Sequence, residues 1–524
     1  MAVLRCRNCL MSNRPPISPA TYLRSRAGRI CVALRGISVH ELLERAETAR
    51  ADSQFLEFRL DGLDEPAAAV ASIGKYLAKH REIIAIATCR RKKYGGGFTG
   101  SLAEELNILA AATEAGFSIV DLEIESAEKC NAFELKALRE TEASLLISYH
   151  NFEKAPDPDA AFTRIQRFEP DFIKVVGTAH SLTDSLNMLR WIAKRSLDVQ
   201  VVGIAMGEPG VVSRILSLRA GSAFTFAATQ DGAETAPGQM TLRTLKDLYC
   251  IEQLDQATRI YGVAGNPVTH SLSPLMQNSA FHRERINAVY LPLKTESVED
   301  LLNLARHLPL SGISVTMPLK QQLLPYLANV DPLTAKLGAC NTIRTGADGK
   351  LYGFNTDVAG IIRPLERRLQ LKGARVLVLG AGGAARAAVF GLAERGSKVA
   401  VWSRKEAAAK ELATSAGAVS VTKQQIATND FDVMINATPC GMHGNPHPLP
   451  LEPDTWKARL VFDLVYNPLD TPLLQIARKR GFATIQGIEM FVYQGARQFE
   501  LWTGKPAPEA EMLRVVLYAL KKPH

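Results

Sequence analysis

Hydrophobic residues in the first 230 positions gather in eight short apolar runs with polar residues between them. The runs cover 29–34, 55–60, 82–89, 118–124, 144–150, 172–178, 199–206 and 223–228. Each interval has room for one amphipathic helix, such as 39–51 after the first run and 101–116 after the third. Eight strand–helix repeats over about 200 residues predict a (β/α)8 barrel in an α/β protein.

Charged side chains lie at the carboxyl ends of these runs, where such a barrel places its catalytic groups. They are Glu57, Arg59, Arg90, His150 and Lys174, and we expect Arg214 in the loop after the seventh run. Any one of them alone is a common surface or paired residue. Because they lie on different strand ends, the set indicates a site.

Lys174 is part of the apolar run FIKVVGTA (Phe172 to Ala179). If the strand is buried, desolvation disfavours the ammonium form, lowers the pKa and frees the amine as a nucleophile toward carbonyl groups. The alternative is a lysine on the polar face of the strand, with its stem along the sheet and its amine in solvent. The run by itself leaves both interpretations open.

Five segments of this half resemble the signature segments of type I 3-dehydroquinate dehydratase, over roughly residues 29–250: FLEFRLD, TCR, SYHNF, FIKVVGTA and APGQ. The resemblance implies that Lys174 forms a Schiff base with the ketone of 3-dehydroquinate, and that His150 is the general base and acid. It also implies substrate-binding roles for Glu57, Arg59, Arg90, Arg214, Thr235 and Gln239. Two positions depart from the family pattern: Tyr94 replaces a common acidic residue, and Ala33 replaces a common serine.

The pattern changes after a predicted last barrel helix and polar linker (240–259). From Tyr261 on, the segments VAGNPVTHSLSP, SGISVTMPLK, GACNTI and YGFNTD carry hydroxyls, a lysine, an amide and a carboxylate at strand ends and turns. Each also has a purely structural interpretation. Ser271 or Ser273 could cap a helix, TMPLK could turn a strand into a helix, and Asp357 could cap a helix start.

A dinucleotide fingerprint follows in KGARVLVLGAGGAARAAVFGLAERG. An apolar strand (375–379) leads into a Gly-x-Gly-x-x-Ala turn and then a helix, a context that predicts a pyrophosphate at the helix amino terminus. The candidate cofactor contacts are Gly380, Ala381, Gly382, Gly383 and Ala384, with Ala385 completing the pattern. The next strand ends in Ser403, Arg404 and Lys405, where an NAD enzyme would present a carboxylate, so NADP is favoured over NAD.

Residues 260 to 520 as a whole are similar to shikimate dehydrogenase. The similar segments are NPVTHSLSP, SVTMPLK, GACNTI, GFNTD, GAGGAARA, NATPCGM, DLVYNPLDTPLL and GIEMFVYQGA, the sixth with Pro439 where serine is commoner. The resemblance implies that Lys320 and Asp357 form the catalytic pair, with Lys320 supplying a proton to the carbonyl oxygen as NADPH delivers hydride to its carbon. It implies substrate contacts at Ser271, Ser273, Thr316, Asn341, Tyr466 and Gln494, and nicotinamide contacts at Leu464 and Gly487.

Together the two resemblances imply a bifunctional enzyme of chorismate and aromatic amino acid biosynthesis. It would dehydrate 3-dehydroquinate to 3-dehydroshikimate and reduce that product to shikimate with NADPH. One alternative is a catabolic quinate-type dehydrogenase fused to the dehydratase. Another is a non-catalytic metabolite sensor, which should have lost its nucleophile or acid–base pair, whereas this chain keeps Lys174 and Lys320.

We expect a basic tail at 1–28, the barrel at 29–252, a substrate-binding domain at 259–362, a Rossmann domain at 363–486 and C-terminal helices at 487–524. The first 28 residues hold five arginines and no acid, so the net charge of +9 falls to about +4 without them. That mild excess suits anionic substrates and NADP rather than nucleic acid. No run reaches the ~18–20 apolar residues of a membrane span.

Eight scattered cysteines indicate reduced thiols in a cytosol-like compartment. Cys6 and Cys9 form a CxxC, but no second pair of ligands accompanies them, so we expect no metal site. The basic amino-terminal segment is short for a plastid targeting peptide. We therefore expect a cytoplasmic enzyme with an unstructured extension, and a plastid location is the alternative. The sequence does not determine the oligomeric state.

Overall fold

A computed structural model describes residues 28–139, 141–445 and 447–521, which form two compact units. Of these described residues, the first unit contains those up to Thr258, with Leu293–Thr295 and Glu299–Leu308, and the second contains the others from Arg259 onward. The expectations for the basic tail and for the Cys6–Cys9 pair lie outside the described residues. In the described part of the chain, no helix combines the length and apolar character needed to cross a membrane.

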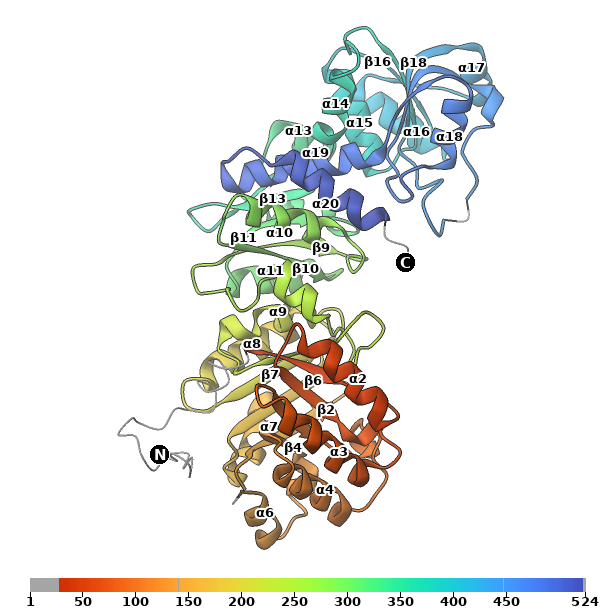
Figure 1. The fold of residues 1–524 in the computed structure, drawn as a ribbon. Helices are drawn as coiled ribbons and strands as arrows, with labels where there is room; N and C mark the ends of the chain where they lie inside the picture. Colours follow the sequence, from red (N-terminus) through yellow and green to blue (C-terminus); the bar gives the residue numbers. More distant parts are fainter. Residues whose placement is uncertain (1–27, 140, 446, 522–524) are drawn as a thin grey trace. The chain divides into compact units, whose positions relative to one another are not determined.

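The first unit contains a sheet of eight parallel strands in the order β7-β6-β5-β4-β3-β2-β1-β8 (Figure 1). The strands are β1 (Ile30–Leu34), β2 (Phe55–Arg59), β3 (Ile84–Thr88), β4 (Ile119–Glu123), β5 (Ser144–Asn151), β6 (Phe172–Thr178), β7 (Val201–Met206) and β8 (Thr225–Ala227). Strand β1 pairs with both β2 and β8, which curls the sheet into a nearly closed barrel. The predicted barrel is confirmed.

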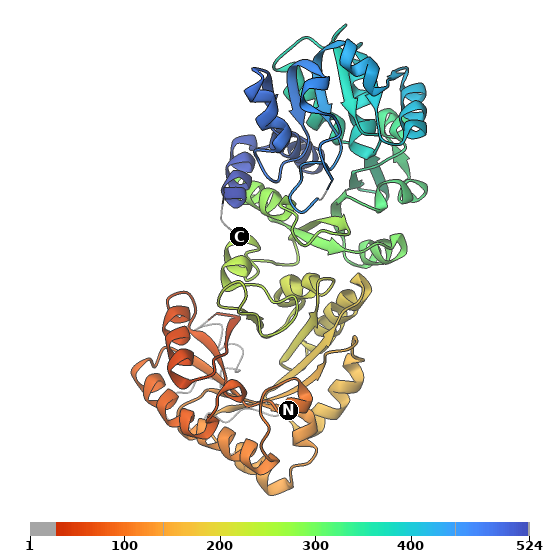
Figure 2. The ribbon, with the colours of Figure 1, turned by 90° about the vertical axis from the view of Figure 1, so that its right-hand side faces the viewer.

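Helices between the strands cover the outside of this barrel (Figure 2). They are α2 (Val39–Arg50), α3 (Pro66–Lys79), α4 (Leu102–Glu114), α5 (Ile124–Ala127), α6 (Ala132–Arg139), α7 (Pro158–Ile165), α8 (Leu182–Arg195) and α9 (Val211–Ala220). Short turns of other helix types are η1 (Leu60–Gly62), η2 (Lys92–Tyr94), η3 (Gln166–Phe168) and η4 (Thr244–Leu248). Capping boxes at Ser101 and Ser181 start α4 and α8, as the sequence of each helix start favours.

Alternation along the strands decides which side chains enter the barrel. Phe172 and Val176 of β6 belong to the apolar core, so Lys174, midway between them on the same face, also points inward. The rings of Phe55 and Phe172 pack edge-on against Phe224, at centroid distances of 5.0 and 5.6 Å. This aromatic core lies toward the amino ends of the strands, and the polar inward positions lie toward their carboxyl ends.

The stretch after the barrel fits its prediction as a last helix followed by a polar linker, but the helix is short. Only η4 forms, and it is wound as a π-helix. Leu245 and Tyr249 are buried, but residues 252–257 are mostly exposed, so the segment lacks the apolar stripe that would support a longer helix.

The second unit begins with a mixed six-stranded sheet in the order β10-β9-β11-β13-β14-β12. Its strands are β9 (Arg259–Gly265), β10 (Ala288–Lys294), β11 (Leu310–Val315), β12 (Asn329–Val330), β13 (Thr342–Thr345) and β14 (Leu351–Phe354). The helices of this region are α10 (Ser273–Arg283), α12 (Leu319–Gln322) and α13 (Pro332–Leu337), with η5 (Leu324–Tyr326). Helix α11 (Val298–His307) follows β10 in the sequence but belongs, from Glu299 on, to the first unit. Strand β11 runs parallel to β9 and antiparallel to β13.

A six-stranded parallel sheet in the order β17-β16-β15-β18-β19-β20 forms the other lobe of this unit, and the predicted Rossmann fold is confirmed. Its strands are β15 (Arg375–Leu379), β16 (Lys398–Trp402), β17 (Val419–Ser420), β18 (Asp430–Asn436), β19 (Lys457–Asp463) and β20 (Ala483–Ile485). Its helices are α15 (Gly383–Glu394), α16 (Glu406–Ala416), α17 (Lys423–Thr428) and α18 (Pro472–Lys479), with η6 (Pro453–Thr455). Helix α14 (Asp357–Glu366) leads into this lobe, and α19 (Gly487–Thr503) and α20 (Glu509–Lys521) return from it, with α19 packed on α14 (Figure 1).

Candidate functional site

Lys174 lies on the inward face of β6 and is only 3% exposed. Its Nζ atom is 3.1 Å from Oδ2 of Asp121 and 4.0 Å from Oε1 of Glu57. The same atom lies 4.1 Å from the centroid of the Phe226 ring. The solvent-exposed interpretation of this lysine is therefore wrong.

The carboxylate of Asp121 is the ion-pair partner of Lys174, which the apolar run around the lysine did not predict. An opposite charge at this distance offsets the desolvation of the ammonium group. Burial by itself raises the pKa of Asp121, but the charges of Lys174 and Arg90 outweigh burial and hold that pKa well below its usual value. The amine thus lies in a buried ion pair at the barrel mouth.

His150, on β5, forms a second buried pair with Glu123 at the end of β4. Its Nδ1 atom is 2.9 Å from Oε2 of Glu123, which also accepts hydrogen bonds from Arg90 and Ser148. Burial raises the pKa of Glu123 to about 7, although Arg90 opposes the shift. Burial and the charges of Arg90 and Lys174 lower the pKa of His150 well below its usual value. The imidazole is therefore neutral near pH 7, the form that can accept a proton.

Two buried arginines are held by carboxylates beside these groups. Arg59 donates from Nε and Nη2 to the two oxygens of Asp61, both at 2.8 Å, and Arg90 donates from Nη2 to Asp121 at 3.0 Å. Asp61 also accepts the backbone N–H of Gly97 at 2.9 Å. A bidentate pair of this kind fixes the plane of the guanidinium, so Arg59 is oriented in advance of any ligand.

Arg214 lies inside α9, not in the loop after β7 where the sequence was expected to place it. A loop of only four residues (207–210) separates β7 from α9, so the helix starts early enough to include this position. The side chain is 2% exposed and donates to the Pro237 carbonyl at 3.1 Å, and its Nε atom has no hydrogen-bond partner among the described residues. Burial lowers the pKa of Arg214 to about 10. Such a guanidinium is suited to an incoming anion.

The segment that Arg214 contacts also carries the last two predicted residues of the barrel site. Oε1 of Gln239 accepts from the backbone N–H of Thr235 at 2.6 Å and from its hydroxyl at 3.1 Å. Arg214 therefore contacts the segment that carries Thr235 and Gln239. The other predicted residues Glu57, Arg90, His150 and Lys174 form one cluster. Of the positions that depart from the family pattern, Ala33 is buried in β1 and Tyr94 ends η2.

Four members of this cluster were missed by the sequence analysis: Asp61, Asp121, Glu123 and Ser148. A signal for two of them was present. The apolar run SIVDLEI contains Asp121 and Glu123 two residues apart, which places both carboxylates on the same buried face of β4. It is the same anomaly, a charge inside an apolar strand, that singled out Lys174.

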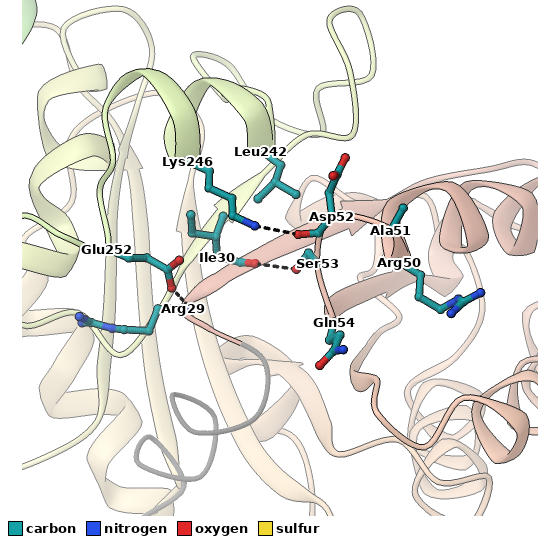
Figure 3. A pocket seen from close by; sticks show the side chains of 10 residues that line it. All are labelled: Arg29, Ile30, Arg50, Ala51, Asp52, Ser53, Gln54, Leu242, Lys246 and Glu252. Carbon is teal, nitrogen blue, oxygen red and sulfur yellow. Dashed lines mark hydrogen bonds between the residues drawn. The ribbon is translucent and has the colours of Figure 1, made fainter. Parts of the chain in front are cut away.

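A cavity of about 230 Å³ lies elsewhere on the barrel (Figure 3). Its lining includes Arg29 and Ile30 at the start of β1, Gln54 just before β2, and Lys246 of η4. These are the amino ends of the strands, whereas Lys174 and His150 face the carboxyl ends. The cations of this cavity have partners of their own, since Lys246 donates to the Asp52 carbonyl at 3.2 Å. The cavity is therefore separate from the cluster.

In the second unit, Lys320 and Asp357 form an ion pair with Nζ 2.7 Å from Oδ2. Asp357 is the first residue of α14 but does not cap it, because the N-cap is Thr356. Its other oxygen accepts from Nδ2 of Asn341 at 2.7 Å. The capping interpretation of Asp357 is wrong. Its carboxylate instead contacts the amine of Lys320 with one oxygen and the side-chain amide of Asn341 with the other.

Other predicted substrate residues lie on the elements around this pair. Ser271 accepts the backbone N–H of Ser273 at 3.2 Å, and Ser273 begins α10. Thr316 follows β11 directly, four residues before Lys320. Gln494 lies on α19, and Tyr466 stacks on Phe491 of the same helix at a centroid distance of 4.8 Å.

The dinucleotide turn has room for a bound pyrophosphate. A Cβ atom added at Gly382 or Gly383 would meet no atom within 4 Å, and Gly383 starts α15 with its free backbone N–H groups. Ala381 and Ala384 flank these glycines, and Ala385 is fully buried against the lobe core. Gly380 has φ +118°, and a Cβ there would lie 3.0 Å from the Ala437 carbonyl oxygen, so glycine is required.

The remaining cofactor candidates lie around the same sheet edge. Ser403, Arg404 and Lys405 follow β16, and both cations are exposed. Leu464 follows β19, and a Cβ at Gly487 would collide with the backbone oxygens of Leu464 and Val465. The glycine thus allows the start of α19 to approach the loop after β19.

Family models match both units. The model for type I 3-dehydroquinase covers residues 30–256. The model for the shikimate dehydrogenase substrate binding domain covers 263–343, the model for shikimate / quinate 5-dehydrogenase covers 364–442, and that for the shikimate 5'-dehydrogenase C-terminal domain covers 487–517.

Individual relatives resemble either the whole chain or its second unit. The bifunctional 3-dehydroquinate dehydratase/shikimate dehydrogenase, chloroplastic, of Arabidopsis thaliana is 34% identical over 505 residues, which cover 92% of this chain and 83% of the relative. The shikimate dehydrogenase (NADP(+)) of Methanosarcina acetivorans is 39% identical over 277 residues, 50% of this chain and 99% of the relative. A solved shikimate 5-dehydrogenase from Thermus thermophilus, in complex with NADP(H) and shikimate, is 35% identical and covers 50% of this chain and 100% of its own, with a TM-score of 0.47. Because the Arabidopsis relative matches through both units, the chain belongs to the family of bifunctional 3-dehydroquinate dehydratase/shikimate dehydrogenases.

Proposed function

We propose that this enzyme catalyses two consecutive steps of the shikimate pathway. The barrel dehydrates 3-dehydroquinate to 3-dehydroshikimate, and the second unit reduces that product to shikimate with NADPH. The single observation that carries the proposal is that one chain of this family contains both a buried Lys174 in the barrel and a Lys320–Asp357 ion pair in the second unit.

In the barrel, the ammonium group of Lys174 gives up one proton, and the resulting neutral amine attacks the substrate ketone. That proton is used again when the ketone oxygen leaves as water, and the product is a protonated imine. The positive nitrogen of the imine then occupies the position beside Asp121 that the ammonium holds now, 3.1 Å from the carboxylate. The imine makes a proton on the adjacent carbon acidic. Loss of this proton and of the β-hydroxyl, which leaves as a second water, gives the enone. Hydrolysis of the imine then consumes one water and frees the lysine.

His150 is suited to move the proton in this elimination. When Glu123 is ionised, it accepts Nδ1–H of the imidazole, and the other ring nitrogen is left without a proton and can act as the base. The same nitrogen can return the proton to the departing hydroxyl. Arg214, a buried guanidinium without a carboxylate partner among the described residues, is suited to hold the substrate carboxylate.

In the second unit, bound NADPH would supply the hydride, and the residues of the chain supply the proton and the orientation. Lys320 donates the proton to the carbonyl oxygen, and Asp357 holds the ammonium in position at 2.7 Å. The open space over Gly382 and Gly383 and the exposed cations Arg404 and Lys405 support a dinucleotide with a 2′-phosphate. Ser271, Ser273, Thr316, Asn341, Tyr466 and Gln494 are the proposed contacts of the substrate.

The test separates the two activities. Lys174→Ala should abolish dehydration, because it removes the amine that forms the imine, and leave the reduction of added 3-dehydroshikimate intact. Lys320→Ala should do the reverse. Borohydride added during turnover of 3-dehydroquinate should reduce the imine and add the mass of the adduct to the tryptic peptide that contains Lys174. An unmodified peptide in an enzyme that still dehydrates would overturn the proposed chemistry.

The same assay tests two finer points. Oxidation of shikimate should outpace oxidation of quinate, and NADP should be preferred to NAD. We also propose a cytoplasmic location, which a fluorescent fusion of the full chain in its native host would check; the Arabidopsis relative is described as chloroplastic.

A further inference from the structure

A buried line of polar side chains runs behind the Lys320–Asp357 pair. It consists of Tyr290 on β10, Ser314 on β11, Gln498 on α19, and Thr342 and Asn341 at the start of β13. All five are nearly inaccessible, with Gln498 3% and Tyr290 0% exposed. Buried polar groups persist in a core when each one is satisfied by its neighbours, so their partners can be followed one by one.

The orientation of Asn341 is fixed by its backbone neighbour. Its Oδ1 atom accepts from the backbone N–H of Thr356 at 2.8 Å, and an N–H can only donate. Nδ2 must therefore face Asp357, to which it donates at 2.7 Å. This amide supports the oxygen of Asp357 that does not bind Lys320.

The orientation of Gln498 is fixed in the same way. Its Nε2 atom faces the backbone carbonyl of Asn341 at 3.4 Å and the hydroxyl of Thr342 at 3.1 Å, and a carbonyl can only accept. Its Oε1 accepts from the Ser314 hydroxyl at 2.8 Å. The hydroxyl of Thr342 in turn donates a hydrogen bond to Oδ1 of Asn341 at 2.7 Å.

Every donation in this line points the same way. Tyr290 donates to Ser314 at 2.6 Å, Ser314 to Gln498, Gln498 to Thr342, Thr342 to Asn341, and Asn341 to Asp357. Hydrogen bonds aligned head to tail polarise one another, and this line ends on the carboxylate that holds Lys320. Burial raises the pKa of the Tyr290 phenol, and its hydrogen bonds with Ser314 and Ser273 only partly offset the rise, so the phenol keeps its proton to donate.

Gln498 also ties α19 to the sheet. Gln494, Gln498 and Trp502 are four residues apart and therefore share one face of the helix. Trp502 donates to the Ile343 carbonyl at 2.9 Å, so the last turns of this face are anchored on β13. The next turn toward the amino terminus presents Gln494, a proposed substrate contact.

We propose that Tyr290, Ser314 and Gln498 are positioning residues for the reductase reaction, acting through Asn341 on the Lys320–Asp357 pair and through α19 on Gln494. The inference rests on the proposed reductase activity. None of the three needs to touch the reacting atoms. Their role is to hold the carboxylate and the amide in one geometry while the substrate binds and leaves.

The decisive variant is Gln498→Glu in the full-length enzyme, assayed as shikimate oxidation with NADP. An ionised carboxylate cannot donate to Thr342, so we expect kcat to fall about 10- to 100-fold near pH 8 with KM for NADP unchanged. Relative to wild type at each pH, the loss should shrink as the pH falls, because a protonated carboxyl can donate in place of the amide. A merely structural defect would not recover in this way.

Tyr290→Phe removes only the first donor, and we expect a smaller loss of kcat of about 3- to 10-fold. Tyr352→Phe is its matched control: it also removes a tyrosine hydroxyl that donates to a partner, Asp348, at 2.9 Å, but outside the line, and should leave kcat unchanged. If Gln498→Glu and Tyr290→Phe both match wild type in a folded protein, the inference is overturned. If wild type itself fails to oxidise shikimate, the proposed function has failed first.

Discussion

At the scale of single residues, charges inside apolar strands are the feature that connects this sequence to its chemistry. Lys174, Asp121 and Glu123 each interrupt an otherwise hydrophobic run and each point into the barrel. Desolvation makes such groups costly unless they are paired, and here each one is paired with another member of the cluster. The protonation state of one member therefore depends on the others.

The pH dependence of dehydration follows from the His150–Glu123 pair. Burial raises the pKa of Glu123 to about 7, so its carboxyl is mostly protonated below that pH and ionised above it. The ionised form accepts Nδ1–H and leaves the other nitrogen of the ring free as a base, whereas a protonated carboxyl can donate its own proton to Nδ1 and leave the ring proton on the nitrogen that should act as the base. We expect kcat for dehydration to rise as the pH increases through about 7, measured by the absorbance of the enone product. Because the two groups are coupled, the midpoint belongs to the pair.

Glu123→Gln tests this assignment. An amide oxygen can still accept Nδ1–H but does not titrate, so the rise near pH 7 should disappear and kcat at pH 8 should fall about 10- to 100-fold through loss of the charge that stabilises the imidazolium. Glu128→Gln is the matched control, since Glu128 pairs with Arg164 at the surface, and it should keep the wild-type profile. An unchanged rise in Glu123→Gln would assign the titration to another group.

At the scale of elements, periodicity predicted most of what the structure contains. The eight apolar runs correspond to β1 through β8, and the strand–GxGxxA–helix pattern corresponds to β15, its turn and α15. What failed depended on contacts between distant segments. Nothing near Arg214 in the sequence indicates that α9 already includes it, and nothing near Thr244 indicates that the last barrel helix is wound as a π-helix.

The same distinction between local patterns and distant contacts applies to the residues of the candidate sites. Residues inside recognisable motifs, such as Lys174 and Lys320, could be named from the sequence. The partners that hold them could not, because Asp121 and Lys174 are 53 residues apart and meet only when β4, β5 and β6 pair in register. The line from Tyr290 to Asp357 joins three strands and two helices, and no local pattern encodes it.

The dinucleotide turn gives a prediction at this scale. Gly382 has a backbone conformation open to any residue, and a Cβ there meets nothing within 4 Å, so Gly382→Ala should leave the melting temperature within about 2 °C of wild type. The added methyl would occupy space proposed for the pyrophosphate, so KM for NADP should rise at least about 10-fold while dehydration is unchanged. Gly380→Ala is the contrast: with φ +118°, it should lower the melting temperature as well. Normal NADP affinity in Gly382→Ala would argue against a pyrophosphate at this turn.

At the scale of the whole molecule, each candidate site is built within one compact unit. The cluster around Lys174 draws its residues from 57 to 239, and the cluster around Lys320 draws its residues from 271 to 498. Among the described residues, neither cluster contains a side chain from the other unit. We therefore expect that neither reaction requires the covalent link between the units, and that mutations can remove one activity without the other.

That independence predicts complementation between two inactive variants. Lys174→Ala cannot form the imine and Lys320→Ala cannot protonate the carbonyl, so neither alone should convert 3-dehydroquinate to shikimate with NADPH. An equimolar mixture should do so, because 3-dehydroshikimate released by the Lys320→Ala protein can diffuse to the second unit of the Lys174→Ala protein. NADPH absorbance should fall after a lag, which shortens as the concentration of the Lys174→Ala protein is raised. A mixture that stays inactive because one folded variant has also lost its remaining activity would mean that the two sites depend on each other within one chain.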